Sequence, residues 1–175
     1  MVDKAVIGSE EWCSFPELGI PAVKARVDSG AKTSSIHAFN LQKFTRNGEP
    51  WISFEIHPLQ GSRQSVLRCE SRIVDRRSVK SSSGFSETRY VIRSTLNFGG
   101  QSWPVELTLA NRDSMGYRML LGREAMQGRV LVDPAESFLQ GRLSSAQLDA
   151  FYKDSTAEKS GLTIGLLASN PDLYS

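Results

Sequence analysis

The stretch "ARVDSGAKTSSIHA", residues 25–38, decides how the rest of the chain is interpreted. It follows an alternating apolar pattern, "IPAVKARV" (20–27), which is typical of a β-strand that ends at Asp28-Ser29-Gly30. These three residue types are common in tight turns, so a plain turn explains the triplet by itself. The same turn could hold the Asp28 carboxylate with its backbone amides, as a catalytic aspartate requires. The triplet alone leaves both interpretations open.

The remainder of the sequence favours short strands joined by tight turns. Asn47-Gly48 is a strong hairpin signal between "HAFNLQKFT" (37–45) and "PWISFEIHP" (50–58), and Gly99-Gly100 is another. One helix is expected where "LSSAQLDAFYKD" begins at residue 143, with Ser144 or Ser145 as its N-cap. We therefore expect an all-β fold, a closed or partly closed barrel with a small helical addition.

A long hairpin with a mobile tip is expected in the middle of the chain. Two alternating segments flank the small, polar run Ser81-Ser82-Ser83-Gly84. Residues 63–93, which include this hairpin, carry 8 Lys and Arg against 3 Asp and Glu. Such a field attracts anionic partners, although a charged face that only contacts solvent is the alternative.

Length and composition are those of one globular domain. The chain has 175 residues and a net charge of +2, and no run of about 18 apolar residues predicts a membrane span. The N-terminus lacks the pattern of a secretory signal, so we expect a cytoplasmic protein. Cys13 and Cys69 are expected to be reduced thiols, with a single disulfide as the alternative.

Three features together give Asp28 a more specific context. The triplet is followed by Ala31 and then by a Thr-Ser pair, "RMLLGREAM" (118–126) places two apolar residues before a glycine, and the flexible hairpin lies between them. This combination resembles the retropepsin-like aspartic peptidases, in which an Asp-Ser/Thr-Gly-Ala loop is catalytic, an apolar-apolar-Gly segment packs beneath it, and a flap covers the substrate. The resemblance implies a retropepsin-like barrel with catalytic Asp28, Ser29 and Gly30, a flap at 81–85, and supporting residues Thr33, Leu121, Gly122 and Arg123.

A narrower resemblance covers about residues 5–140. "VDSGAKTSSIHA", "RSVKSSSGFSETRYVI" and "LLGREAM" are similar to the family often labelled ATP-dependent zinc proteases, which accompanies RimK-type ATP-grasp glutamate ligases. The tail "SGLTIGLLASNPDLYS" resembles the opening strand and loop of such a ligase. We therefore expect a peptidase domain at 1–142, a helix at 143–159 and, at 160–175, either a ligase-like start or a tail that packs on the barrel.

Aspartic catalysis requires two carboxylates about 3 Å apart that share one proton. The sequence contains one Asp-Ser-Gly triplet and no second copy. Asp28 is therefore expected to meet Asp28 of a second copy across a two-fold axis, which makes the active form a homodimer.

The sequence contains no motif that would support the zinc or the ATP in the family label. The sequence has no H-E-x-x-H and no G-x-x-x-x-G-K-[ST], and its two histidines, His37 and His57, are not near each other or near a cysteine in sequence. We expect no cofactor. A metal shared by Asp28, His37 and a third ligand is the alternative.

The expected substrate is an acidic peptide. Basic residues on both arms of the hairpin, together with Lys32 after the triplet, favour carboxylates. The resemblance implies oligo-glutamate tails added by a partner ligase. Nucleic acid is not expected, because stacking aromatics are sparse. The non-enzymatic alternative is a dimeric module that binds acidic peptides. The substrate-binding candidates are Ala31, Lys32, Arg76, Arg77, Lys80, Gly84 and Arg89, with Arg93 on the same arm.

Overall fold

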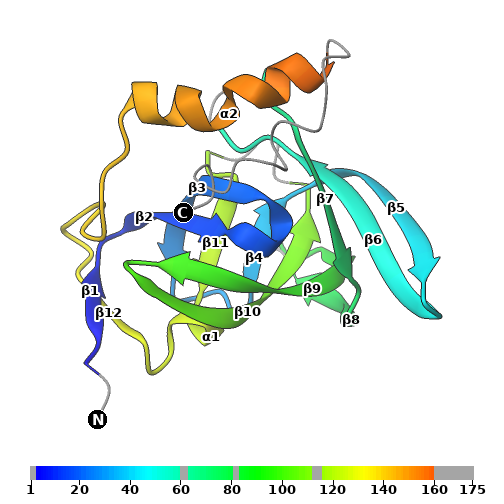
Figure 1. The fold of residues 1–175 in the computed structure, drawn as a ribbon. Coiled ribbons are helices and arrows are strands. Elements are labelled where there is room, and N and C mark those ends of the chain that lie inside the picture. The colour runs from blue at the N-terminus through cyan, green and yellow to red at the C-terminus, as the bar shows by residue number, and fades with distance from the viewer. Residues whose placement is uncertain (1–2, 60–62, 81–82, 112–115, 160–175) are drawn as a thin grey trace.

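A computed structural model of the chain describes residues 3–59, 63–80, 83–111 and 116–159. Most of this part is β-strand, arranged as a barrel with a small separate sheet and a two-stranded ribbon (Figure 1). The prediction of an all-β, partly closed barrel with a small helical addition is confirmed. The tail at 160–175 and the hairpin residues Ser81 and Ser82 lie outside the described residues.

The barrel is one sheet of seven strands that curves back on itself. Its strands are β2 (Glu10–Phe15), β3 (Ile20–Asp28), β4 (Ser34–His37), β8 (Asp75–Lys80), β9 (Ser86–Phe98), β10 (Gln101–Ala110) and β11 (Met119–Gly122). Six of them follow the order β10-β4-β11-β3-β2-β9, and β9 pairs again with β10. Between β2 and β9 the register has one pair, Ser14 with Asn97, so the ring is only partly closed there.

Alternation along the strands places the apolar side chains inside the barrel. On β3, Val23 and Ala25 are buried in the core while Arg26 is exposed, as the two-residue period of a strand requires. Gly99 and Gly100, both at positive φ, form the expected turn between β9 and β10. The core is contiguous from the barrel to the small sheet.

The small sheet is inserted between β4 and β8 and has three antiparallel strands. They are β5 (Phe39–Arg46), β6 (Glu49–Ile56) and β7 (Leu67–Arg72). Asn47 and Gly48, both at positive φ, form the predicted turn between β5 and β6. In Figure 1 the β5–β6 hairpin projects to one side of the barrel.

The ribbon and the helices complete the fold. The ribbon pairs β1 (Ala5–Ile7) in parallel with β12 (Val130–Val132). The helices are the 3-10 turn η1 (Pro16–Leu18), the short α1 (Arg123–Met126) and α2 (Ser145–Lys159). No helix within the described ranges is long and apolar enough to cross a membrane.

Helix α2 crosses the top of the barrel in Figure 1 and is attached to β3. Tyr152 is buried, and its hydroxyl accepts a hydrogen bond from the Ala22 amide at 3.1 Å and donates one to the Ala22 carbonyl. Ser144 caps the helix: its hydroxyl accepts from the Gln147 amide at 3.2 Å, and the Gln147 side chain accepts from the Ser144 amide at 2.8 Å. This reciprocal pair is a capping box.

Both cysteines are free and buried. Burial raises the pKa of Cys69 to about 12, and burial together with the Glu11 charge raises the pKa of Cys13 as well. Since the thiolate is the reactive form, we expect neither thiol of the folded protein to react with iodoacetamide at pH 8. Mass spectrometry should find both alkylated in denaturant. Rapid labelling of Cys69 without denaturant would contradict the packing of the small sheet.

Candidate active site

Asp28 is the last residue of β3, and it lies beside the glycine of the apolar-apolar-Gly segment. Strands β3 and β11 run parallel, with Leu121 opposite Val27 and Gly122 opposite Asp28. The two strands therefore end side by side, where their chains turn into the 29–33 loop and into α1. The structure thus brings together the two segments that the retropepsin resemblance pairs.

The loop after β3 holds the Asp28 carboxylate through its own backbone. The Gly30 amide donates to Asp28 Oδ1 at 3.0 Å, and the Ala31 amide donates to the Asp28 carbonyl at 3.2 Å. Asp28 is half-buried, while Ser29 and Gly30 are exposed. Within the described part of the chain, the Ser29 hydroxyl makes no hydrogen bond. The geometry leaves one carboxylate, fixed in orientation, at an open surface.

Helix α1 supports the loop from below. The Arg123 amide donates to the Ala31 carbonyl at 2.8 Å, and the Arg123 guanidinium donates to the Gly30 carbonyl at 3.3 Å. The Glu124 amide donates to the Lys32 carbonyl at 3.1 Å. The first amides of a helix have no partner within the helix, so the loop carbonyls satisfy them.

Ser34 is a supporting residue that the sequence analysis did not single out. Its hydroxyl accepts a hydrogen bond from the Gly122 amide at 2.9 Å, in a buried position. The sequence contains the Thr33-Ser34 pair, of which Thr33 was predicted to be the supporting residue. Both residues also line a neighbouring cavity.

Gly122 has no room for a side chain. A Cβ there would lie 2.7 Å from the Thr33 carbonyl carbon and 2.8 Å from the Ser34 amide nitrogen, both backbone atoms. We expect Gly122→Ala to lower the free energy of unfolding by about 1–3 kcal/mol and to reduce any activity that depends on the loop. Urea unfolding measures the first effect. Gly116→Ala, at a glycine with open space around it, is the matched control. Equal stability of the two variants would contradict the close packing.

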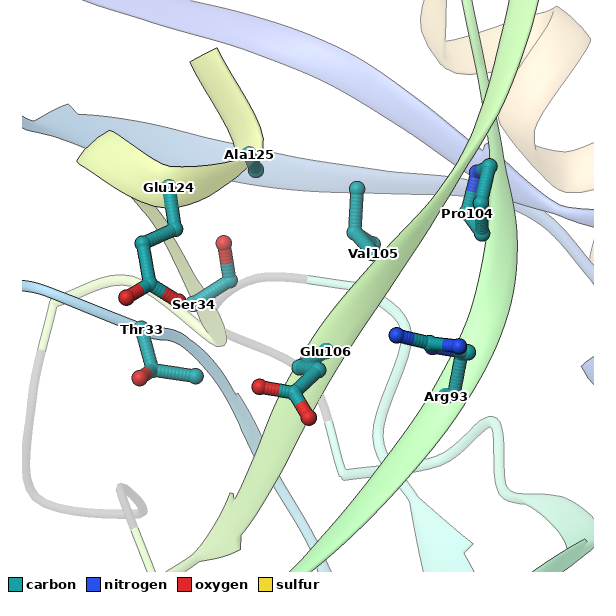
Figure 2. A pocket seen from close by; sticks show the side chains of 8 residues that line it. All are labelled: Thr33, Ser34, Arg93, Pro104, Val105, Glu106, Glu124 and Ala125. Carbon is teal, nitrogen blue, oxygen red and sulfur yellow. The ribbon is translucent and has the colours of Figure 1, made fainter. Parts of the chain in front are cut away.

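A cavity of about 180 Å³ lies beside the loop. Figure 2 shows the carboxylates of Glu106 and Glu124 and the hydroxyl of Thr33 around it, with Arg93 on the far side. Both carboxylates already have cationic partners. Glu106 accepts two hydrogen bonds from Arg77, at 3.0 and 3.2 Å, and Glu124 lies 3.8 Å from the Lys32 ammonium.

The segment that was expected to form the flap is a hairpin. Strands β8 and β9 pair from Asp75 opposite Val91 to Lys80 opposite Ser86. Gly84, at φ 89°, lies between the two strands in sequence.

The basic residues of the hairpin differ from one another in their surroundings. Arg77 is engaged by Asp75 at 2.6 Å and by Glu106, so its charge is already compensated. Arg89 is mostly buried, 3.5 Å from Glu87, and its Nε has no hydrogen-bond partner. Arg76 and Lys80 are exposed and make no ion pair with another described residue. The sequence predicted that all these basic residues line the substrate site, whereas in the structure carboxylates already compensate the charge of some of them.

The two histidines lie together, although they are far apart in sequence. The His37 and His57 rings stack with centroids 5.9 Å apart, because the small sheet brings the end of β6 over the end of β4. His37 lies next to Arg118, the residue before β11 and four residues from Gly122, and therefore about 13 Å along the strand direction from Asp28. This separation does not favour a metal shared by Asp28 and His37. No group of three or more His, Cys, Asp or Glu in the described ranges could hold a metal ion.

Comparisons with known proteins agree with this geometry. A probable alpha-L-glutamate ligase of Shewanella pealeana is 66% identical over 173 residues, and one of Parasynechococcus marenigrum is 61% identical over 175 residues. They match 99% and 100% of this chain, which spans 38% of the length of either relative. A crystal structure of a Legionella pneumophila protein of unknown function has a TM-score of 0.66 at 26% identity, covering 79% of this chain and 99% of that one.

The model of one protein family matches residues 6–143, well over half of the chain. Its description, retropepsin-like aspartic endopeptidase RimB, agrees with the barrel and with the pairing of Asp28 and Gly122. The resemblance noted from the Asp28 loop is confirmed: the chain belongs to the RimB-like family of retropepsin-like aspartic endopeptidases.

Proposed function

We propose that the chain is an aspartic peptidase that hydrolyses peptide bonds in acidic peptides, with a catalytic pair formed by Asp28 from two copies. The observation that carries the proposal is the fixed, accessible Asp28 carboxylate at the β3–β11 junction in a member of an aspartic endopeptidase family. Asp28-Ser29-Gly30 occurs once in the sequence, so one chain supplies one such carboxylate.

The chemistry follows from two carboxylates that share one proton. The ionised carboxylate takes a proton from water while the resulting hydroxide adds to the carbonyl carbon of the scissile bond. The protonated carboxyl gives its proton to the carbonyl oxygen, which forms a neutral tetrahedral diol. The C–N bond then breaks: the nitrogen receives a proton from one carboxyl, and a diol hydroxyl returns a proton to the other. One water is consumed, and a carboxyl and an amine are released.

The ribbon β1–β12 supports a homodimer. Val6, Leu131 and Val132 expose 45%, 54% and 41% of their surface on these two short strands, which pair only with each other among the described residues. The ribbon follows α1 directly, so it is tethered to the helix that supports the Asp28 loop. Burying this apolar surface against a second copy would be favourable, and it would place the ribbon near the two-fold axis, which must pass between the two Asp28 residues.

The proposed substrate class is oligo-glutamate. The alpha-L-glutamate ligase names belong to the relatives, and an acidic product of such ligases would suit exposed cations such as Arg76 and Lys80. The 160–175 tail resembles the opening of an ATP-grasp ligase, and we propose that such a ligase is a partner or a fused domain. The proposed binding residues are on the flap (Arg76, Lys80, Gly84, Arg89, and Arg77 where substrate displaces its partners) and on the loop (Ala31, Lys32).

The test is incubation of the protein with a peptide that ends in several glutamates, followed by mass spectrometry, with and without EDTA. We expect cleavage within the glutamate run, unchanged by EDTA. Cleavage that is lost in EDTA and restored by zinc would favour a metallopeptidase. Binding of the peptide without cleavage would favour the non-catalytic module.

A further inference from the structure

The face of β3 that carries Asp28 also carries an arginine. Side chains two residues apart on a strand project to the same side, so Arg26 and Asp28 share a face, with their Cα atoms about 6.6 Å apart. Val27, between them, packs against the core, which confirms that the shared face is the one away from the barrel interior. Arg26 is exposed. A full positive charge therefore lies on the same open surface as the proposed catalytic carboxylate.

The neighbours of Arg26 orient its guanidinium without pairing it with a carboxylate. Its guanidinium carbon lies 5.7 Å from the centre of the Tyr117 ring, a cation–π contact. Glu10 is directly opposite Arg26 on β2, but its carboxylate accepts a hydrogen bond from the Tyr117 hydroxyl. That hydrogen bond is the main reason why the pKa of Tyr117 is raised, so the hydroxyl stays protonated and continues to occupy Glu10. Arg26 makes no ion pair with any described acidic residue.

Arg26 differs in this respect from two of the cations that were predicted to bind substrate. Lys32 lies close to Glu124, and Arg77 is held by two carboxylates. Any substrate carboxylate must compete with those partners, whereas Arg26 offers its donors from a guanidinium that is already positioned. Leu120, opposite Arg26 on β11, adds an apolar surface next to it that suits the methylene groups of a glutamate side chain.

We propose that Arg26 is a specificity-determining residue whose guanidinium binds the carboxylate of a substrate residue flanking the scissile bond. The proposal rests on the proposed peptidase function. An extended peptide advances about 3.3 Å per residue, so in a substrate that runs beside β3 a residue about two positions from the bond lies level with Arg26 when the bond lies at Asp28. In a two-fold symmetric dimer the second Arg26 has the same place on the other side of the bond. Bonds with glutamate on both sides are therefore favoured, which directs cleavage to the interior of a glutamate run.

The test compares two peptides. The first contains a run of six glutamates, and the second is identical except for glutamine at the flanking positions, which are the two residues on each side of the bond cleaved by the wild type. We expect Arg26→Gln to lower kcat/KM for the first peptide at least about 10- to 100-fold and to leave kcat/KM for the second nearly unchanged, because the charge-assisted pairs made by the two Arg26 side chains of the dimer are lost only with the first. Arg142→Gln is the matched control: this exposed arginine also lies over an aromatic ring, Phe138 at 5.4 Å, but far along the chain from the site.

Two further variants separate recognition from folding. Arg26→Lys keeps the positive charge and is expected to retain part of the preference for the first peptide. Arg26→Glu is expected to prefer a peptide with lysine at the flanking positions. Equal losses on both peptides, or no loss on either, would overturn the role of Arg26. If the wild type cleaves both peptides but their ratio is unchanged in Arg26→Gln, only this inference fails. If the wild type cleaves neither, the proposed function fails with it.

Discussion

Replacement of Asp28 with asparagine is expected to lower the rate of peptide hydrolysis at least about a thousand-fold. The amide is nearly isosteric with the carboxylate and can still accept a hydrogen bond from the Gly30 amide through its oxygen, so the loop should keep its conformation. What the variant loses is the group that takes and returns protons. We therefore expect the melting temperature and the affinity for an acidic peptide to change little while the rate collapses.

Steady-state cleavage of the glutamate peptide, followed by mass spectrometry, measures this effect. Asp149→Asn, an exposed aspartate on α2, removes the same charge away from the loop and should retain full activity. A rate for Asp28→Asn within a few-fold of the wild type would exclude Asp28 as the catalytic group. The proposed mechanism would then have no carboxylate at its centre.

The largest expected effect on stability comes from Glu11, which is fully buried although it is an acid. Its carboxylate accepts hydrogen bonds from the backbone amides of Gly8 at 2.7 Å, Leu139 at 2.9 Å and Gln140 at 3.1 Å. It thereby ties β2 to the segment that follows the ribbon. Glu11→Gln keeps the volume but turns an NH2 group toward amide donors, and it removes the charge that strengthens the bonds.

We expect Glu11→Gln to lower the free energy of unfolding by about 3 kcal/mol, since hydrogen bonds to charged groups are strong and unpaired buried donors are costly. Urea denaturation of the two proteins gives this difference directly. The control is Glu136→Gln, at an exposed position in the same segment. If both variants unfold at the same urea concentration, the three hydrogen bonds contribute no net stability.

Local patterns predicted a large part of the fold. Asn47-Gly48 and Gly99-Gly100 predicted two hairpins because Asn and Gly adopt positive φ more readily than other residues, whatever their tertiary surroundings. Along β6, the buried Ile52, Phe54 and Ile56 alternate with Ser53 and Glu55, as the two-residue period of the predicted strand requires. The junction of Asp28 with Gly122 was reached through the family resemblance, because a pairing across more than ninety residues leaves no local signal.

The features that could not be predicted from the sequence depend on tertiary contacts. His37 and His57 come together only because the inserted sheet folds over the end of β4. Arg77 appeared to be a free cation, since its partner Glu106 lies on a strand that the sequence places 29 residues away. Arg26 lies outside the basic stretch, so the charge distribution of the sequence did not single it out. Its lack of a carboxylate partner depends on the tertiary contact in which Tyr117 packs against Arg26 and donates a hydrogen bond to Glu10.

The central claim is that two copies of Asp28 form one catalytic site, and subunit mixing tests it most directly. Wild type and Asp28→Asn are mixed in equal amounts at constant total protein, with exchange of subunits verified by native mass spectrometry of a tagged copy. If each site needs both carboxylates, only dimers of two wild-type chains are active, and activity falls to about one quarter of that of the unmixed wild type. A fall to about one half would mean that each chain acts alone and would contradict the shared site.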